Sequence, residues 1–502
     1  MQALVIRADA SAMIGTGHVM RCLALAQAWQ DAGGRAIFAM GIEVPALADR
    51  LISEGMEVFH LSAEPGSSDD ARQTANLATD VGSDWVVVDG YHFGADFQRM
   101  IKESDLSLLF IDDQGHADHY YADIVLNQNL HANEDLYRSR EPYTKLLLGT
   151  RYVLLRREFW LWRGWERETP KVAHKVLVTL GGSDPDNVTL KVVRALQQIG
   201  QFDVVAIIGG SNSHYNEILS AVGVNRSIRL EKNVKNMPEL IANADLAVSS
   251  AGVTSWEMAF LGLPSIVLIL AENQVDVAEQ LASARIAISL GWHNHLSPTS
   301  IIKEVCSLAL DVHTRASMSE LGRQTVDGYG ANRVLADLLE RTIYLRKVCE
   351  KDREQIYEWA NDPDSRDASF SSAPLSWNEH VSWFERKIRD PETVFYIAYD
   401  VKNQPLGVVR FDLDDRDATI NLNLGNNARG RGLASLIVDK SIKELSGERH
   451  IFKVNAFIKH SNIRSIRTFE KSGFSFVGYE TVKGDRALHY IFQCSDKAEE
   501  EA

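Results

Sequence analysis

Two residues near the start of the chain, His18 and Arg21 in the stretch IGTGHVMRC, have side chains suited to proton transfer and anion binding. The pattern predicts a strand, then a turn with Gly15 and Gly17, then a helix whose first turn carries both side chains. A helix N-terminus is partly positive, so we expect His18 to stay neutral near pH 7. A neutral imidazole can accept a proton. His18 is therefore a candidate general base, and Arg21 and the two glycines are candidate substrate-binding residues.

The glycines of this turn do not complete a dinucleotide site. The G-x-G-x-x-G fingerprint needs a third glycine where this chain has Met20. Loops at the carboxyl ends of parallel strands are still the places where open α/β sheets bind ligands. The alternative is that His18 only caps or packs its helix, and the neighbouring glycines favour the catalytic interpretation.

Two later stretches, TLGGSDPDN and SSAGVTSWE, also place glycines between an apolar run and a helical segment. Backbone N–H groups at such turns can hold an anion. The candidate binding residues in these turns are Gly181, Gly182, Ser183, Ser250, Gly252 and Thr254. Glu257 lies one turn into the second helix, where its carboxylate could hold ribose hydroxyls. A plain strand-to-helix connection is the alternative for each turn taken singly.

The same region contains a D-x-D sequence, Asp184 and Asp186, of the kind that can bridge a metal to a diphosphate. No further carboxylate or histidine has ligand spacing around it, so we interpret both as turn residues and predict no metal. The four cysteines are widely separated and include no C-x-x-C pair. The sequence therefore indicates neither a disulfide framework nor a zinc site.

A third glycine turn lies in LNLGNNARGRGLASL, where an alternating strand pattern runs into an amphipathic helix. It fits the pattern R-x-x-G-x-A. Its glycines would let the backbone approach a pyrophosphate, whose charge meets the helix N-terminus and two arginines. A solvated basic loop is the alternative. The candidate residues are Arg429, Gly430, Arg431, Gly432, Leu433 and Ala434.

The elements that must position these residues follow two patterns. Over about the first 340 residues, apolar runs alternate with helical segments in two series, which predicts two parallel α/β lobes. The Trp- and Arg-rich segment 152–171 is interpreted as the crossover between them. Short strands and helices then predict an α+β domain. We expect domains at 1–155, 156–342 and 343–502.

The composition is that of an ordinary folded protein of 502 residues, 45% of them hydrophobic. Lys and Arg number 53 against 68 Asp and Glu, a net charge of −15 without a basic cluster, which disfavours a nucleic acid or an anionic membrane as partner. The longest apolar run, LPSIVLILA, is too short to cross a bilayer, and the N-terminus has no signal-like core. A cytoplasmic protein is expected, and the sequence leaves its oligomeric state open.

The turns after the second series of strands resemble the nucleotide-binding half of the GT-B glycosyltransferases, which bind UDP without metal. The stretches that carry this resemblance are GGSDPDN, SSAGVTSWE and the later ENQ. A narrower resemblance, over roughly residues 1–340, is to the UDP-sugar hydrolases of pseudaminic acid biosynthesis. It is carried by three stretches, RADASAMIGTGHVMRCLALAQA, VVVDGYHF and IDDQGHADHYYADIVLNQN. The resemblance implies removal of UDP from UDP-2,4-diacetamido-2,4,6-trideoxy-β-L-altropyranose. It makes His18 the base that activates water and places Tyr91 in the active site.

The resemblance also implies how UDP and the sugar are bound. Glu257 would hold the ribose, and the segment 233–240, which includes Met237, would hold the uracil through backbone contacts. Asn273 and Gln274 would lie near the sugar or the phosphate. Departing UDP is a good leaving group, so this chemistry needs a base and an anion-binding surface but no general acid.

Downstream of the third glycine turn, FKVNAFIKHSNIRSIRTFEKSGF adds Asn455 and Asn462. Together with that turn and Leu424, this stretch resembles a GNAT N-acetyltransferase over about residues 343–495, which implies acetyl-CoA as co-substrate. Many members carry a Tyr, thought to protonate the thiolate of coenzyme A, where this chain has Phe469. We expect Phe469 to be a core residue, and the general acid and base of this domain stay unassigned.

The predicted fold class is thus α/β, with two Rossmann-like lobes of GT-B type followed by an α+β GNAT domain. The leading hypothesis is a bifunctional enzyme that acetylates the 4-amino group of UDP-4-amino-4,6-dideoxy-N-acetyl-β-L-altrosamine and then hydrolyses the product to sugar and UDP. These are consecutive steps of one pathway, so their fusion is reasonable.

Three alternatives stay open. A GT-B glycosyltransferase fused to an acetyltransferase would have the same nucleotide half. The equivalent steps toward another nonulosonic acid would differ only in pocket shape. A non-enzymatic scaffold that binds nucleotide sugar or coenzyme A is disfavoured by His18 beside a glycine turn.

Overall fold

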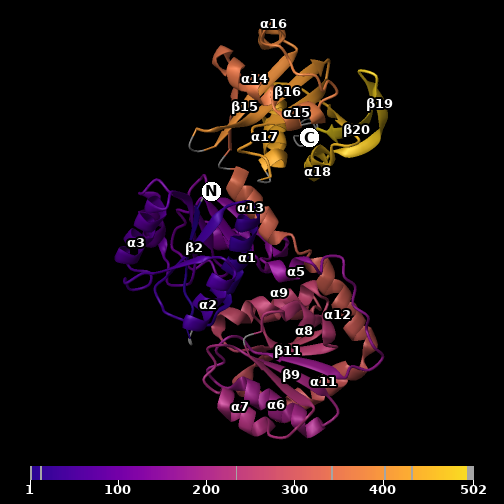
Figure 1. Cartoon of the computed structure of the whole chain (residues 1–502). Coiled ribbons are helices and arrows are strands. Elements are labelled where there is room, and N and C mark those ends of the chain that lie inside the picture. Colours follow the sequence, from indigo (N-terminus) through magenta and orange to yellow (C-terminus); the bar gives the residue numbers. More distant parts are fainter. Residues whose placement is uncertain are drawn as a thin grey trace. The chain divides into compact units, whose positions relative to one another are not determined.

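A computed structural model describes residues 3–11, 14–232, 234–340, 343–400, 403–430 and 433–494. The chain divides into two compact units, Met1–Leu335 and Ala336–Ala502 (Figure 1). The finer boundaries expected near residues 155 and 342 stay predictions.

A seven-stranded parallel sheet forms the first half of unit Met1–Leu335, in the order β3-β2-β1-β4-β5-β6-β7. Strands of a parallel sheet are covered on both faces, which explains why β1 is buried at every residue. The strands are β1 (Ala3–Ala8), β2 (Arg35–Met40), β3 (Glu57–His60), β4 (Ser83–Asp89), β5 (Ser107–Ile111), β6 (Ile124–Asn127) and β7 (Lys145–Leu148). The helices are α1 (Gly17–Asp31), α2 (Pro45–Ser53), α3 (Ser68–Asp80) and α4 (Ala95–Lys102), with short helical turns at Glu134–Tyr137 and Thr150–Tyr152.

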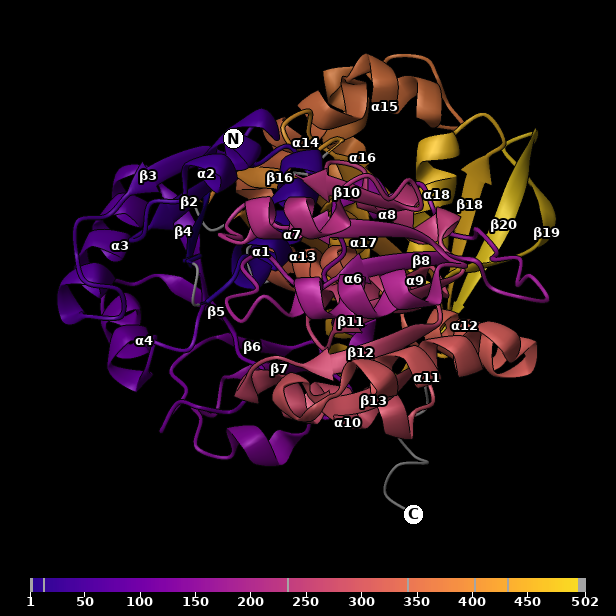
Figure 2. The ribbon, with the colours of Figure 1, turned by 90° about the horizontal axis from the view of Figure 1, so that it is seen from below.

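A six-stranded parallel sheet forms the second half, in the order β10-β9-β8-β11-β12-β13. Figure 2 shows β8, β11, β12 and β13 in that order. The strands are β8 (Lys175–Thr179), β9 (Asp203–Ile208), β10 (Ile228–Lys232), β11 (Leu246–Ser250), β12 (Ser265–Ile269) and β13 (Ala287–Trp292). The helices are α6 (Val188–Ile199), α7 (Tyr215–Val222), α8 (Met237–Asn243), α9 (Val253–Phe260), α10 (Val275–Ser283), α11 (Pro298–Leu310) and α12 (Val312–Thr325), with short helical turns at Glu272–Gln274 and His293–His295. The boundary between the two units falls within α13 (Gly330–Glu340).

The crossover segment between the two sheets carries the short helix α5 (Arg157–Trp160). Val153, Leu155 and Phe159 from this segment are buried in the same core as α9 and β11 of the second sheet. The segment belongs to neither sheet, as predicted, and its apolar side chains join it to the second lobe.

Both sheets reverse their strand order at one point, between β1 and β4 in the first and between β8 and β11 in the second. Connections from the two strands at such a point run to opposite faces of the sheet, which leaves a crevice at their carboxyl ends. The predicted turns of unit Met1–Leu335 follow β1, β8 and β11. The topology therefore places all three where α/β sheets bind ligands.

Unit Ala336–Ala502 contains a mixed sheet in the order β14-β15-β16-β17-β18-β20-β19. β17 and β18 are parallel, and the other neighbours are antiparallel. The strands are β14 (Ile343–Lys347), β15 (Thr393–Asp400), β16 (Pro405–Asp414), β17 (Asp417–Leu424), β18 (Lys453–Lys459), β19 (Ser475–Val482) and β20 (Asp485–Gln493). The helices are α14 (Arg353–Asn361), α15 (Pro363–Ala368), α16 (Trp377–Arg389), α17 (Leu433–Glu448) and α18 (Ile463–Lys471), after a short helical turn at Glu350–Asp352.

The predicted fold class, two parallel α/β lobes followed by an α+β domain, is confirmed. Over the described ranges, every helix is too short or too polar to cross a membrane.

Candidate active site

The three glycine-containing segments of unit Met1–Leu335 lie against one another. A Cβ on Gly17 would be 3.6 Å from Val253 Cγ2, at the start of α9. A Cβ on Gly182 would be 2.7 Å from Thr16 Oγ1, closer than a side chain there could come. The turn after β8 therefore needs glycine because the segment before α1 packs on it. The structure brings together turns that are more than 160 residues apart in sequence.

His18 lies in the first turn of α1, beside these glycines, and is 8% exposed. Its Nδ1 is 2.6 Å from Oδ1 of Asp89, the last residue of β4. A carboxylate accepts a hydrogen bond from Nδ1–H, so this contact leaves Nε2 as the basic nitrogen. The ring of Tyr91 packs edge-on against His18, with ring centroids 5.0 Å apart. The imidazole is buried, but it lies where the glycine turns meet and is not part of the apolar core cluster of the lobe.

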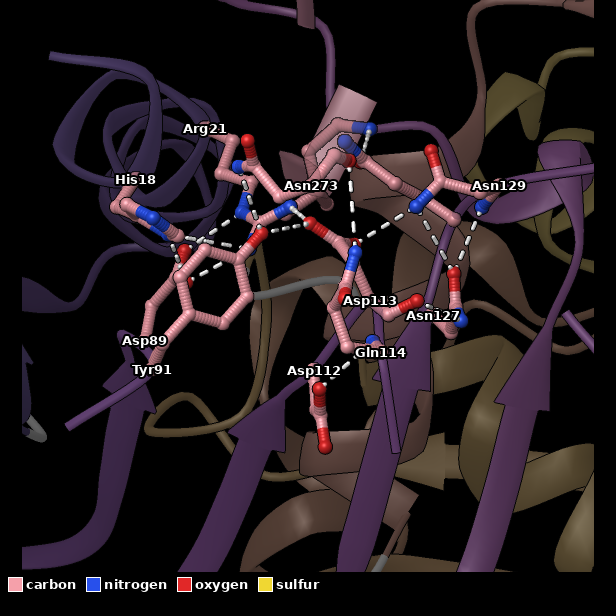
Figure 3. A network of polar contacts seen from close by, with 12 residues as sticks. His18, Arg21, Asp89, Tyr91, Asp112, Asp113, Gln114, Asn127, Asn129 and Asn273 are labelled. Atoms are coloured by element: carbon pink, nitrogen blue, oxygen red, sulfur yellow. Dashed lines mark hydrogen bonds and ion pairs between the residues drawn. The ribbon is translucent and has the colours of Figure 1, made fainter. Parts of the chain in front are cut away.

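Arg21 lies beside His18 and is bound to two carboxylates (Figure 3). Its Nε and Nη2 donate to Asp89 at 2.6 and 2.7 Å, and its Nη1 donates to Oδ2 of Asp113 at 2.6 Å. Burial opposes the ionisation of Asp89, but Arg21 and His18 outweigh it and hold its pKa well below the usual range. Arg21 was predicted to bind substrate. The structure instead gives its guanidinium two buried protein partners, which indicates a positioning role.

The hydrogen bonds continue from Asp113 to the second lobe. Asn129 Nδ2 donates to Asp113 Oδ1 at 2.8 Å, and Trp256 Nε1, on α9, donates to Asn129 Oδ1 at 3.1 Å. Asn129 is 4% exposed and Trp256 is 1% exposed. A continuous buried chain of polar contacts thus runs from His18 to the helix whose first turn was predicted to bind the diphosphate.

A second set of contacts also joins the lobes. Asn273 Nδ2 donates to Tyr91 Oη at 3.2 Å, and Gln114 Nε2 donates to the Asn273 carbonyl oxygen at 3.4 Å. Burial, together with the charge of Asp113, raises the pKa of Tyr91 well above its usual value. Tyr91 therefore keeps its proton and can act as a donor but not as a base. The structure places the predicted residues Tyr91 and Asn273 side by side near His18.

The charges in this network suit His18 to accept a proton. Asp89 and Asp113 carry two negative charges, and Arg21 carries one positive charge. With neutral His18 the group has one negative charge in excess, and a proton on Nε2 cancels it. Coulomb attraction in a buried site is weakly screened, so the network stabilises the imidazolium that forms when His18 takes a proton.

The two helices after the turns of the second lobe differ at their N-termini. Asp184, 3% exposed, accepts the Val188 and Thr189 N–H groups of α6 at 2.8 Å each, so a side chain of the turn itself occupies that helix end. Among the residues that the structure describes, no side chain caps α9, which begins just after Gly252. Of the two predicted anion sites, the one at α9 keeps its helix N-terminus available to a ligand. At Gly181 and Gly182, only the backbone N–H groups of the turn could contact an anion, because Asp184 occupies the N-terminus of α6.

The remaining predicted binding residues of this lobe differ in their contacts and in their exposure. Glu257 Oε1 accepts from Arg156 Nη2 at 2.6 Å in a buried pair, so the predicted ribose ligand already has a protein partner. Gln274 accepts the backbone N–H of Leu270, and Met237 is buried in the core. Ser183 and Ser250 are buried at the two turns, and Gly15, Gly252 and Thr254 are partly exposed. Residue 233 of the predicted uracil segment lies outside the described residues.

In unit Ala336–Ala502, Arg429 is held by the protein. Its Nη1 pairs with Asp362, its Nη2 donates to Ser365 Oγ at 2.8 Å, and its Nε donates to the carbonyl oxygen of Leu424. The predicted contact with pyrophosphate would have to compete with these partners. Arg431 and Gly432 lie outside the described residues.

The other predicted residues of this turn flank a gap in the sheet. Gly430 has a φ of 73°, which favours glycine, and α17 begins at Leu433, followed by Ala434. Among the described residues, β17 pairs with β18 over Asp417–Thr419 and not beyond. The rest of β17, which ends at Leu424, leaves an unpaired edge that leads to the turn. Such an edge can accept the amides of an extended ligand.

The asparagines and Phe469 of this unit lie close to β18. Asn462 caps α18 by accepting from Ser465 N–H at 3.1 Å, so its predicted role at the cofactor has a structural alternative. Asn455 lies on β18 and contacts His489. Phe469 is buried, with its ring 5.0 Å from that of Phe474, as expected for a core residue.

Several residues of the site were missed by the sequence analysis. Asp89, Asp113 and Asn129 were present in the quoted stretches but were given no role. A signal was available, since these side chains end or directly follow the apolar strands β4, β5 and β6. Carboxyl ends of neighbouring parallel strands meet at one edge of the sheet. Polar residues at three such ends in succession indicate a shared network.

Comparison with known families gives two matches. Residues 176–327 match the glycosyltransferase family 28 C-terminal domain, and residues 342–475 match the acetyltransferase (GNAT) domain. The chain is therefore a GT-B-like α/β module joined to a GNAT acetyltransferase domain.

Three individual proteins are also similar to this chain. An uncharacterized protein of Methanocaldococcus jannaschii is 26% identical over 505 residues, 98% of this chain and 99% of its own length. The UDP-2,4-diacetamido-2,4,6-trideoxy-beta-L-altropyranose hydrolase of Campylobacter jejuni is 25% identical over 281 residues, 56% of this chain and 96% of its own. The spore coat polysaccharide biosynthesis protein SpsG of Bacillus subtilis is 26% identical over 259 residues, 50% of this chain and 75% of its own.

Two solved structures are also similar. MurG of Acinetobacter baumannii has a TM-score of 0.48 at 15% identity and covers 68% of this chain and 99% of its own. Spermidine N-acetyltransferase of Vibrio cholerae has a TM-score of 0.29 at 15% identity and covers 30% of this chain and 96% of its own. Taken with the family matches, the relatives identify the chain as an enzyme with a hydrolase-like module and an acetyltransferase module. The predicted resemblance to the UDP-sugar hydrolases of pseudaminic acid biosynthesis, fused to a GNAT domain, is confirmed.

Proposed function

We propose that unit Met1–Leu335 hydrolyses UDP-2,4-diacetamido-2,4,6-trideoxy-β-L-altropyranose to free sugar and UDP. We further propose that unit Ala336–Ala502 first acetylates the 4-amino group of UDP-4-amino-4,6-dideoxy-N-acetyl-β-L-altrosamine with acetyl-CoA. The observation that carries the hydrolase proposal is the contact between His18 and Asp89 at the meeting point of the glycine turns. The named hydrolase relative supports the choice of substrate.

In the proposed hydrolysis, His18 Nε2 takes a proton from a water molecule, whose oxygen attacks the anomeric carbon. The bond from that carbon to the diphosphate oxygen breaks, and UDP departs with the electron pair. The free N-terminus of α9 stabilises the developing charge on the diphosphate. Asp89, Arg21 and Asp113 hold the imidazolium until its proton returns to solvent.

For the acetyl transfer, the chain offers features that fit coenzyme A. The unpaired edge of β17 and the turn at Gly430 could hold an extended arm and a diphosphate. Acetyl-CoA supplies an activated acyl group. The chain's own residues must orient the acceptor amine and remove its proton.

The direct test supplies the UDP-amino sugar with acetyl-CoA, in buffer without any glycosyl acceptor. Free CoA and free UDP are expected together. CoA without UDP would remove the hydrolase proposal, and UDP only after addition of an acceptor would favour a glycosyltransferase. A panel of UDP-amino sugars, with product identification by NMR, distinguishes the altrose series from other nonulosonic acid precursors.

The link between the lobes gives a further prediction. Trp256→Phe keeps an aromatic ring on α9 but removes the N–H that binds Asn129, which leaves a buried acceptor unpaired. We expect kcat for UDP release to fall about tenfold, the effect of about 1.4 kcal/mol on the barrier. Trp160→Phe is the matched control, because it removes an indole hydrogen bond to the Leu155 carbonyl oxygen outside the network. Equal kcat values for the two variants would contradict the positioning role.

A further inference from the structure

His489 lies on β20, and within the described part of the chain only one of its ring nitrogens, Nε2, has a hydrogen-bond partner. Its Nε2 is 3.0 Å from Asn455 Oδ1, and its ring stacks on Phe457 with centroids 4.7 Å apart. Asn455 Nδ2 points to the Ala418 carbonyl oxygen, at 3.4 Å, so the oxygen of the amide faces His489. An amide oxygen only accepts hydrogen bonds, which assigns the imidazole proton to Nε2 and leaves Nδ1 as the base.

The sheet register places this imidazole where β17 and β18 separate. Thr419 and Asn455 form the last pair between the two strands, and His489 lies opposite Phe457, two residues farther along β18. From Thr419 the edge of β17 runs about 17 Å to Leu424, at roughly 3.4 Å a residue. A thioester arm that follows this edge from a diphosphate at Gly430 would end beside the contact between Asn455 and His489.

The face on which His489 lies can be assigned from its neighbours. Tyr490, the next residue, donates to Glu470 of α18, and successive side chains of a strand point to opposite faces. His489 therefore points away from α18, toward the side of α15. On that side, α15 is hydrogen-bonded to both strands that border the gap. Ser365 Oγ of α15 donates to Asn423 Oδ1 of β17 at 2.9 Å. Lys459 Nζ of β18 donates to the Asp367 carbonyl oxygen of α15 at 3.1 Å.

The electrostatic setting keeps the imidazole uncharged. Burial is the largest influence and lowers the pKa of His489. Glu480 of β19 opposes this effect, and Lys453 of β18 adds to it. Near neutral pH the ring can therefore take up a proton.

We propose that His489 is the catalytic base of the acetyl transfer and removes a proton from the acceptor ammonium group. The proposal rests on the proposed acetyltransferase function and assigns the base of this domain. Phe469 has no hydroxyl to protonate the thiolate, and in this scheme the amine supplies that proton. His489 Nδ1 takes one proton, and the freed lone pair of the amine attacks the acyl carbon. The carbon–sulfur bond breaks, the second amine proton neutralises the thiolate, and His489 returns its proton to solvent.

The first test is His489→Gln in the full chain. We expect kcat for acetylation at pH 7 to fall about 10²–10³-fold, the usual contribution of a general base. Affinity for coenzyme A, measured by calorimetry, should not change. The deficit should narrow as the pH rises, because the amine then arrives already deprotonated. The exposed His450→Gln is the control and should match the unaltered chain.

A second variant keeps the imidazole and changes its proton affinity. Asn455→Asp puts a carboxylate against Nε2–H, which favours the imidazolium, so the acidic limb of the kcat profile should move to higher pH. An NMR titration of the ring, assigned by its loss in His489→Gln, should move in the same direction without substrate. A purely structural role would leave the profile unmoved.

The outcomes separate this inference from the proposed function. Absence of acetylation by the unaltered chain, with every UDP-amino sugar supplied, would remove the function itself. Acetylation by the unaltered chain, with full activity and an unmoved profile in both variants, would overturn the role of His489 alone.

Discussion

Asp89→Asn is expected to lower kcat for UDP release about a thousandfold. The carboxylate holds the Nδ1–H tautomer of His18 and balances the imidazolium, and an amide can do neither. Such a change in the His–Asp pair of a serine protease costs about 10⁴ in kcat. The KM should change little, since Asp89 is fully buried and its two oxygens already contact His18 and Arg21. The measurement is UDP release with the diacetamido substrate under saturating conditions.

Asp70→Asn is the matched control for this prediction. Asp70 is also fully buried in the first lobe, and it binds Arg7 through both oxygens, at 2.8 and 2.9 Å, outside the site. Both variants lose a buried carboxylate from an arginine pair and should lose thermal stability. Only Asp89→Asn should lose turnover per folded molecule. Activity of Asp89→Asn within tenfold of the control would contradict the paired-base account.

Arg21→Met is expected to destabilise unit Met1–Leu335 by about 3–5 kcal/mol, the cost of leaving buried charges without their partner. The guanidinium is the shared partner of Asp89 and Asp113, and burial opposes its charge less than the two carboxylates favour it, so its pKa is raised. Thermal unfolding at pH 7 measures the loss. Arg72→Met removes an exposed pair with Asp69 and should leave the unfolding midpoint unchanged.

The stability lost in Arg21→Met should depend on pH in a definite direction. The pKa of Asp89 is depressed in the folded protein, so its contribution to stability is present above the unfolded-state value, about 3.9, and is lost as the pH falls below it. Arg21→Met removes most of this contribution. The difference in unfolding free energy between the unaltered chain and Arg21→Met should therefore stay wide down to about pH 4 and narrow below it. A gap that widens on acidification would contradict the assigned pairing.

The fold was predictable where strands are buried on both faces. Runs such as DWVVVD and PSIVLIL are apolar throughout because helices cover both sides of a parallel sheet, and they form β4 and β12. The strands with weaker sequence signals lie at sheet edges, such as β3 and β10. β3 is largely exposed, and its four residues, EVFH, form no continuous apolar run.

The site was predictable only in part, for a physical reason. His18 and the glycine turns have local signals, because a turn before a helix constrains residue types within a few positions. The partnership of His18 with Asp89 spans 71 residues and depends on how β1 and β4 are paired in the sheet. Sequence does not show whether a charge near a turn faces a ligand or another side chain. For Arg21 and Arg429 the structure supplies protein partners instead.

The most direct measurement follows the oxygen of water. Hydrolysis of the UDP-diacetamido sugar in H₂¹⁸O, analysed by mass spectrometry, reports which bond breaks. Attack at the anomeric carbon by a water molecule that His18 activates predicts one ¹⁸O in the released sugar and none in UDP. Label in the UDP would show attack at phosphorus and would contradict the account.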